Sequence, residues 1–263
     1  MYVFELDQPG TWLDSLNDES RHDAQSLLQL LNTCIQDAAI ALSMFEESQG
    51  ALRASDHSER TWETDAMRER VVEERLESSL PPGLSPHDHF LALDRVRELA
   101  RLEVKREKWR DGHIPSAYLH RMPFLHAKTY VYALDILHKA LAKLSSIPEV
   151  PSAVADVLRD YEAAFPNLLD VRDSSHHAED RVQGKRRQTR IELKPVVNDV
   201  ISAATGGVLF VDILNGSRYG GTLADGSFGE VDVSPESLAL AQACVQGVFN
   251  AFRWRGPAMH LPW

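Results

Sequence analysis

Arg172 and His177 lie five positions apart within the segment 168–178, and Asp173 and His176 lie between them. A neutral histidine can take the proton from a ribose 2′-hydroxyl at physiological pH. An arginine guanidinium can hold a phosphate by paired hydrogen bonds and stabilise the charge that develops on its oxygens. Together these residue types can cleave RNA without a metal ion, with Asp173 or His176 as the supporting group.

The spacing of Arg172 and His177 raises a geometric question. On a straight helix, five positions turn through about 500°, which leaves the two side chains about 140° apart. His176, four positions after Arg172, shares the face of Arg172 much better. If His177 is the working base, either the helix is distorted near the serines that precede the histidines, or a second copy of the chain completes the site.

A basic stretch follows the histidines. It brings six positive charges into fourteen residues, and Glu192 is the only acid there; the cations are Arg181, Lys185, Arg186, Arg187, Arg190 and Lys194. Such a cluster is typical of a surface that contacts phosphates. A solvated linker between a helical part and a strand-rich part would have the same composition, so both interpretations stay open.

Other interpretations of these residues compete with the catalytic one. The acids and arginines over 170–181 also fit a solvated helix face with weak ion pairs. His87-Asp88-His89 has metal-binding residue types, but a helix start places its two histidines on different sides, and Asp88 suits the positive end of the helix dipole. No zinc motif of the His-Glu-x-x-His type occurs, so a metal-dependent hydrolase is the weakest alternative.

The elements that must position these residues are mainly helical. Apolar residues recur at helical spacing over 20–47, 59–79, 85–109, 123–144 and 151–178. The segment 59–79 is so rich in charge that it predicts a solvated helix, whereas 123–144 is apolar enough for a central core helix. Ser85-Pro86 supplies an N-cap followed by proline at the first helical position.

After residue 183 the pattern changes from helix to strand. Asn215-Gly216 and Asp225-Gly226 separate the apolar runs 208–214, 217–223 and 228–233, which predicts a three-stranded antiparallel meander. Ser234-Pro235 then starts a C-terminal helix, while 190–204 is ambiguous between strand and helix. We therefore expect a mainly α fold, with a helical bundle over 1–182 and a basic linker, meander and helix over 183–263 packed on it.

The stretch 168–178 resembles the Arg-x4-6-His signature of the HEPN family (higher eukaryotes and prokaryotes nucleotide-binding), with Arg172, the polar Asp173 and His177 at its positions. Outside this stretch, the resemblance is limited to the order of the expected helices over residues 20–180. It implies a helical bundle and a metal-independent endoribonuclease with no cofactor, whose site is completed in a homodimer. It also implies RNA as substrate and a toxin or defence role with an antitoxin or regulatory partner; the alternative is a non-catalytic nucleotide-binding or protein-interaction module.

Composition limits the remaining possibilities. The 263 residues are 43% hydrophobic, enough for a real core, and the formal net charge of −11 argues against a protein that coats nucleic acid over its whole surface. The acidity is uneven, because residues 1–100 hold 8 Lys or Arg against 20 Asp or Glu, while 101–263 hold 20 against 19.

Only Cys34 and Cys244 occur, which excludes a disulfide framework and suits a reducing compartment, so we expect a cytoplasmic protein. We expect no membrane span, because no stretch approaches about 18 consecutive apolar residues.

Overall fold

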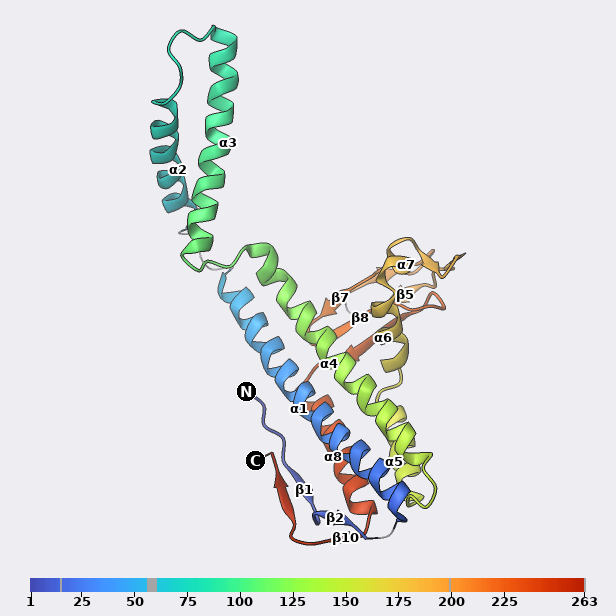
Figure 1. The fold of residues 1–263 in the computed structure, drawn as a ribbon. Helices are drawn as coiled ribbons and strands as arrows, with labels where there is room; N and C mark the ends of the chain where they lie inside the picture. The colour runs from blue at the N-terminus through green and yellow to red at the C-terminus, as the bar shows by residue number, and fades with distance from the viewer. Residues whose placement is uncertain (15, 56–60, 199, 263) are drawn as a thin grey trace. The chain divides into compact units, whose positions relative to one another are not determined.

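The computed structural model describes residues 1–263 except 15, 56–60, 199 and 263. The chain forms two compact units, one made of Met1–Glu47 with Met122–Trp263 and the other of Ser48–Arg121 (Figure 1). The expected boundary near residue 182 does not separate compact units, since both of its sides belong to the first unit. The chain is mainly helical, with small antiparallel sheets and a C-terminal helix, as the sequence predicts.

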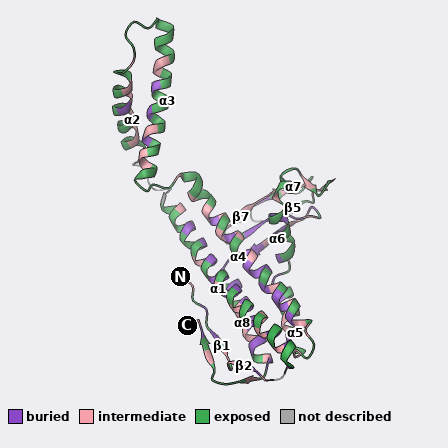
Figure 2. Cartoon of the chain, viewed as in Figure 1, coloured by how far each residue is buried: buried purple, intermediate pink, exposed green. Residues whose placement is uncertain are grey.

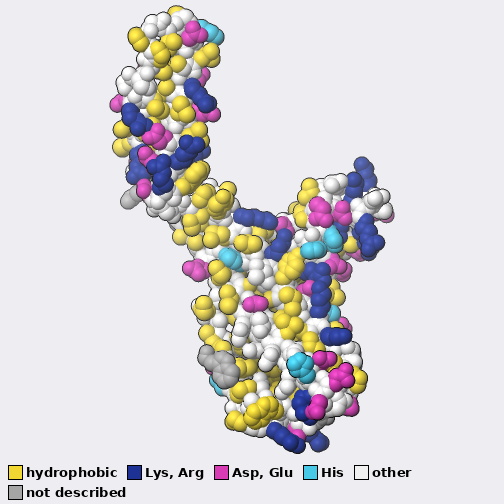
Figure 3. Space-filling model, in the orientation of Figure 1, with side chains coloured by type: hydrophobic (Ala, Val, Ile, Leu, Met, Phe, Trp, Pro, Cys, Tyr) yellow, Lys and Arg dark blue, Asp and Glu magenta, His cyan; other side chains and the backbone are white. Residues whose placement is uncertain are grey.

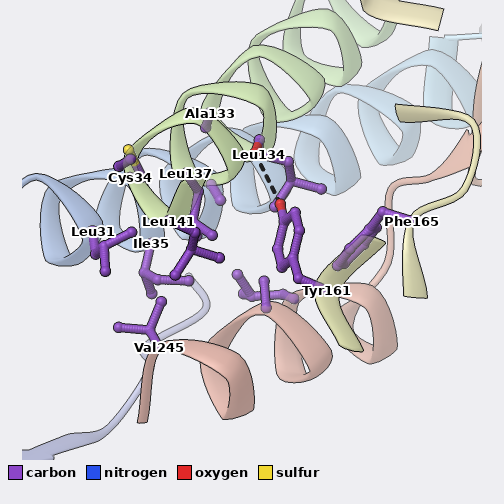
Figure 4. Close-up of a cluster of buried hydrophobic side chains, with 14 of the residues drawn as sticks. Leu31, Cys34, Ile35, Ala133, Leu134, Leu137, Leu141, Tyr161, Phe165 and Val245 are labelled. Carbon is purple, nitrogen blue, oxygen red and sulfur yellow. Dashed lines mark hydrogen bonds between the residues drawn. The ribbon is translucent and has the colours of Figure 1, made fainter. Parts of the chain in front are cut away.

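The helices of the first unit surround one hydrophobic core. They are α1 (Asp18–Ser55) up to residue 47, α4 (Ser116–Ser145) from residue 122, α5 (Ala153–Ala164), α6 (Leu168–His176), the short α7 (Ala178–Val182) and α8 (Pro235–Ala251). Figure 4 shows α1, α4, α5 and α8 contributing side chains such as Ile35, Leu137, Tyr161 and Val245. The Tyr161 hydroxyl lies within this core and donates a 2.9 Å hydrogen bond to the carbonyl of Leu134.

The predicted central helix is confirmed, and it is longer than expected. The periodicity placed its start at Pro123, but α4 begins at Ser116 and contains that proline. Most of the buried residues in Figure 2 lie in the first unit, where α1 and α4 each have a nearly continuous apolar face. The helix α1 contains, within Asp18–Ala54, an 18-residue window that is long and apolar enough to cross a membrane, contrary to our expectation, and 44% of that window is buried inside the protein.

The second unit contains α2 (Thr61–Glu77) and α3 (Pro86–Arg110), which pack against each other. The predicted cap is confirmed, since the Ser85 hydroxyl accepts a 3.2 Å bond from the Asp88 N–H. Asp88 in turn accepts a 2.6 Å bond from that hydroxyl, so the acid of the His87-Asp88-His89 triplet serves the helix start. The predicted solvated character of α2 is also confirmed, because Val72 is the one buried residue among its described side chains.

The predicted meander is present as β7 (Ile213–Asn215), β8 (Arg218–Thr222) and β9 (Phe228–Asp232), paired antiparallel in the order β7-β8-β9. The structure starts β7 at residue 213 rather than 208. Tyr219 and Val231 are paired across the ladder and both are buried, and β8 and β9 contact α6. The capping box of Ser234 with Ser237 then starts α8. The meander thus forms a support for the helix that carries Arg172.

The sequence did not indicate the pairing of the two ends of the chain. The strand β1 (Leu6–Gln8) pairs with β11 (Met259–Leu261), and β2 (Trp12–Leu13) pairs with β10 (Trp254–Arg255). Gly10 lies between the two N-terminal strands, and a Cβ there would come within 2.7 Å of the Arg255 carbonyl oxygen. The ambiguous segment 190–204 forms the short pair β5 (Val196–Val197) and β6 (Ser202–Ala203).

Cys34 is buried and Cys244 is half-buried, which gives a first testable prediction. Burial raises the pKa of the Cys34 thiol to about 12 and also raises the pKa of Cys244, and a thiol, unlike a thiolate, is a poor nucleophile. We expect neither cysteine to react with Ellman's reagent at pH 8 in the folded protein, and both to react once urea unfolds it. Stoichiometric labelling of Cys34 under native conditions would contradict the burial described here.

Candidate functional site

The candidate site lies where α6 ends. Arg172, Asp173 and His176 are on α6, and His177 is the residue that follows it, with φ −102° and ψ 43°. The N–H of His177 still donates a 3.0 Å bond to the Asp173 carbonyl, and the short helix α7 begins directly afterwards. His177 is therefore the C-cap residue, and its own φ and ψ depart from helical values although its N–H keeps the last helical bond.

Arg172 is held by two carboxylates. Its Nε lies 2.9 Å from Oδ2 of Asp135 on α4, and its Nη2 donates a 3.2 Å bond to Oδ1 of the same residue. Its Nη1 lies 2.6 Å from Oδ1 of Asp173. The side chain of Arg172 is only 18% exposed, so the guanidinium is both fixed in place and largely neutralised.

Asp135 is the buried centre of this ion-pair cluster. Its side chain is 3% exposed, and Lys139 brings a second cation within 2.7 Å of Oδ2. A buried carboxylate is tolerated only when opposite charges and hydrogen bonds surround it, and here two cations do so. The cluster contains Arg172, Lys139, Asp135 and Asp173, so its formal charges sum to zero.

A phenol from α4 and two imidazoles meet at the end of α6. Nδ1 of His176 lies 3.2 Å from the hydroxyl oxygen of Tyr132 on α4, and the rings of His176 and His177 are 5.1 Å apart, edge to face. Burial raises the pKa of Tyr132, and Arg172 opposes that shift. The phenol therefore stays protonated at neutral pH and can donate a hydrogen bond to His176.

His177 is the more open of the two histidines. Its side chain is 52% exposed, and its Nδ1 lies 3.6 Å from a carboxylate oxygen of Glu179, which is itself 70% exposed. Figure 3 shows histidine side chains next to Lys and Arg side chains over the region of α6 and α7. An imidazole in this position can reach a bound ligand without movement of the backbone.

The serines before the histidines have a structural role. Ser174 and Ser175 are 3% and 6% exposed. The hydroxyl of Ser175 is 2.7 Å from the Tyr219 hydroxyl, which donates a 2.6 Å bond to Asp212. These hydrogen bonds hold α6 against the meander. The two serines are therefore buried and are not placed to contact a phosphate.

The predicted cationic residues divide into buried and exposed ones. Arg181 is 3% exposed, and its Nη1 donates a 2.7 Å bond to the carbonyl of Lys185, so it supports the backbone and is not available to RNA. Arg186 and Arg190 are exposed on a hairpin made of β3 (Lys185–Arg186) and β4 (Thr189–Arg190). Arg187 is exposed in the turn of this hairpin and has a φ of 57°. Lys185 is half-buried and donates a 2.9 Å bond to the Gln183 side chain.

The comparisons with known proteins add nothing to this geometry. No family model, curated protein or solved structure matches the chain. Within the described parts of the chain, no group of three or more His, Cys, Asp or Glu side chains is arranged to hold a metal ion. The chemistry of the site is therefore argued from its own side chains.

Sequence reasoning missed the contribution of α4. Four polar side chains of this helix recur at spacings of four, three and four residues, which places them on one face; they are Lys128, Tyr132, Asp135 and Lys139. That polar stripe beside the buried apolar face of α4 was the available signal. It marks the surface against which α6 lies.

The ion-pair cluster predicts unequal effects of removing its two acids. Replacing Asp135 by Ala leaves Arg172 and Lys139 without their shared carboxylate, and we expect the free energy of unfolding to fall by about 3 kcal/mol. Replacing Asp173, whose side chain is 54% exposed, by Ala is expected to cost less than about 1 kcal/mol. Urea unfolding followed by circular dichroism measures both, and equal losses would show that Asp135 does not centre the cluster.

Proposed function

We propose that the surface at the end of α6 is a metal-independent RNA-cleaving site of the HEPN type. The observation that carries the proposal is the contact of the Tyr132 hydroxyl with His176 at 3.2 Å and of the His176 ring with His177 at 5.1 Å, on the helix that also carries Arg172. The exposed arginines of the β3–β4 hairpin follow the site closely in the chain. The HEPN-like bundle itself belongs to this proposal and rests on the resemblance of residues 168–178.

The proposed reaction needs only groups that this site contains. One imidazole takes the proton of a ribose 2′-hydroxyl while the 2′-oxygen bonds to phosphorus. The bond from phosphorus to the 5′-oxygen breaks, and a second imidazole or a water gives that oxygen a proton, which leaves a 2′,3′-cyclic phosphate and a 5′-hydroxyl. We assign proton transfer to His177 because it is the more exposed histidine, and we assign its support to His176, which the Tyr132 hydroxyl orients.

Arg172 would stabilise the phosphate, but its ion pairs with Asp135 and Asp173 limit how it can do so. Asp135 and Asp173 already engage the guanidinium, so a phosphate must displace Asp173, the more exposed acid, or bind donors that remain. In a homodimer, as the family resemblance implies, the arginine of a second copy would add positive charge to the same site. RNA in the cytoplasm and an antitoxin or regulatory protein remain the proposed partners.

The neutral charge of the cluster favours a second candidate function. If Asp135 and Asp173 hold Arg172 permanently, the site cannot gain a phosphate contact from it, and the chain would act as a non-catalytic nucleotide-binding or protein-interaction module. The two functions differ in a single measurable property, which is cleavage of RNA in the absence of metal ions.

Cleavage in excess EDTA tests the proposal. We expect the purified chain to cut single-stranded RNA in EDTA, to leave cyclic phosphate ends, and to lose about 10²- to 10⁴-fold in rate on His177→Ala, the usual effect of removing a general acid or base. His22→Ala, on an exposed part of α1, is the matched control and should keep full activity. RNA or nucleotide binding without cleavage by the unmodified chain would instead favour the binding module.

The exposed hairpin predicts a salt-dependent contribution to binding. Each arginine that contacts a phosphate of single-stranded RNA releases counterions, so Arg186→Ala with Arg190→Ala should lower the slope of log K against log salt by about 0.7 per arginine. Arg181→Ala is no suitable probe, because its buried side chain supports the backbone. Arg159→Ala, on the exposed surface of α5, is the control and should leave the slope unchanged; an unchanged slope in the hairpin variant would remove the hairpin from the RNA surface.

A further inference from the structure

A cleft lies between the first half of α1 and the two strand pairs that join the ends of the chain. Its volume is about 720 Å³, within the range of about 300–1,000 Å³ that is usual for small-ligand sites. Its lining residues come from α1 and from all four terminal strands. In Figure 1 these strands lie at the end of the first unit where α1 begins. None of the described residues that line the cleft belongs to the site at the end of α6.

The α1 side of the cleft is polar but uncharged. Gln25, Gln29 and Asn32 are spaced by four and three residues, which brings them to within about 60° of one another on the helix. The run 24–36 contains no Asp, Glu, Lys or Arg, although a solvated helix face normally carries such residues. None of the described lining residues of the whole cleft has a carboxylate, ammonium or guanidinium group. A charged ligand would lose hydration here without gaining a counter-charge, so the cleft suits an uncharged one.

The three amides keep their hydrogen-bonding groups free. No other described residue bonds to the side chains of Gln25, Gln29 or Asn32, and the Oδ1 atom of Asn32 is buried without a partner. A buried polar atom without a partner is destabilising, so a native structure that keeps one usually uses it. Each amide offers both donors and an acceptor. The cleft therefore suits a ligand whose own groups both donate and accept.

Trp12 of β2 gives the cleft a fixed aromatic wall. This residue is 58% exposed. Gly256, with φ 85°, lies against it, and a Cβ there would come within 2.9 Å of Cζ3 of the indole, so the glycine lets the backbone approach the ring. Trp254 also lines the cleft, and its indole N–H donates a 2.7 Å bond to the Phe249 carbonyl. A large aromatic ring that is held in place and still exposed is typical of a ligand-binding surface.

We propose that this cleft binds a neutral saccharide. Sugar hydroxyls both donate and accept hydrogen bonds, so they match the carboxamides of Gln25, Gln29 and Asn32. An indole face is apolar and electron-rich, so the ring of Trp12 can pack against the C–H face of a pyranose. Nucleotides bring phosphates, for which the described lining holds no Lys or Arg. This inference does not depend on the reaction proposed above.

Titration calorimetry on the full chain tests the proposal. The probes are maltotriose, cellotriose and tri-N-acetylchitotriose at up to about 10 mM, and we expect at least one of them to bind. Trp12→Ala should weaken binding of that saccharide by about 10-fold or more, because it removes the aromatic wall. Trp109→Ala, at a tryptophan of the second unit that is 51% exposed, is the matched control and should leave the affinity unchanged.

Two amide variants separate a binding role from a structural one. Asn32→Leu removes the buried oxygen that has no partner and keeps the branched shape of the side chain. We expect its urea midpoint to stay the same or rise while saccharide binding weakens by about 10-fold or more. Gln29→Ala, at an exposed position, should weaken binding without changing the urea midpoint.

Three results would overturn the proposal. The first is that none of the three saccharides binds at this concentration. The second is unchanged saccharide affinity in both Trp12→Ala and Gln29→Ala, since the binding would then lie elsewhere on the chain. The third is that adenosine or uridine binds in place of every saccharide and is lost in Trp12→Ala, which would assign the cleft to nucleobases.

Discussion

The buried carboxylate of Asp135 is the constraint on which the candidate site depends. It lies on α4 within the core unit, where an unpaired charge would be very costly, so cations have to reach it. Lys139 comes from the same helix, but Arg172 comes from α6, and their contact fixes where α6 lies against α4. The position of the two histidines relative to the Tyr132 hydroxyl follows from that contact.

The meander holds α6 from its other side. The hydroxyls of Ser175 and Tyr219 meet in a buried hydrogen bond, and Asp212 accepts from the tyrosine. The site is therefore built on rigid elements up to His176, and only His177 lies in the short turn before α7. Preorganised groups of this kind suit catalysis and tight binding equally, which is why the resting geometry agrees with both proposed functions.

Local signals in the sequence predicted local structure well. The serines before Pro86 and Pro235 mark helix starts, and the Asn-Gly and Asp-Gly dipeptides mark the hairpin turns, because each device works within a few residues. Features that depend on contacts distant in the sequence could not be predicted in this way. Asp135 meets Arg172 through packing alone, and no spacing in the basic stretch after the histidines shows that Arg181 is buried.

The pairing of β1 with β11 has a consequence for the order of folding. The partners of residues 6–13 lie at 254–261, so these pairings cannot form on the ribosome until almost all of the chain described here has emerged. Until then Leu6 and Leu13, both buried in the folded protein, have no strand to cover them. Closure of the first unit by these strands is therefore a late step in synthesis.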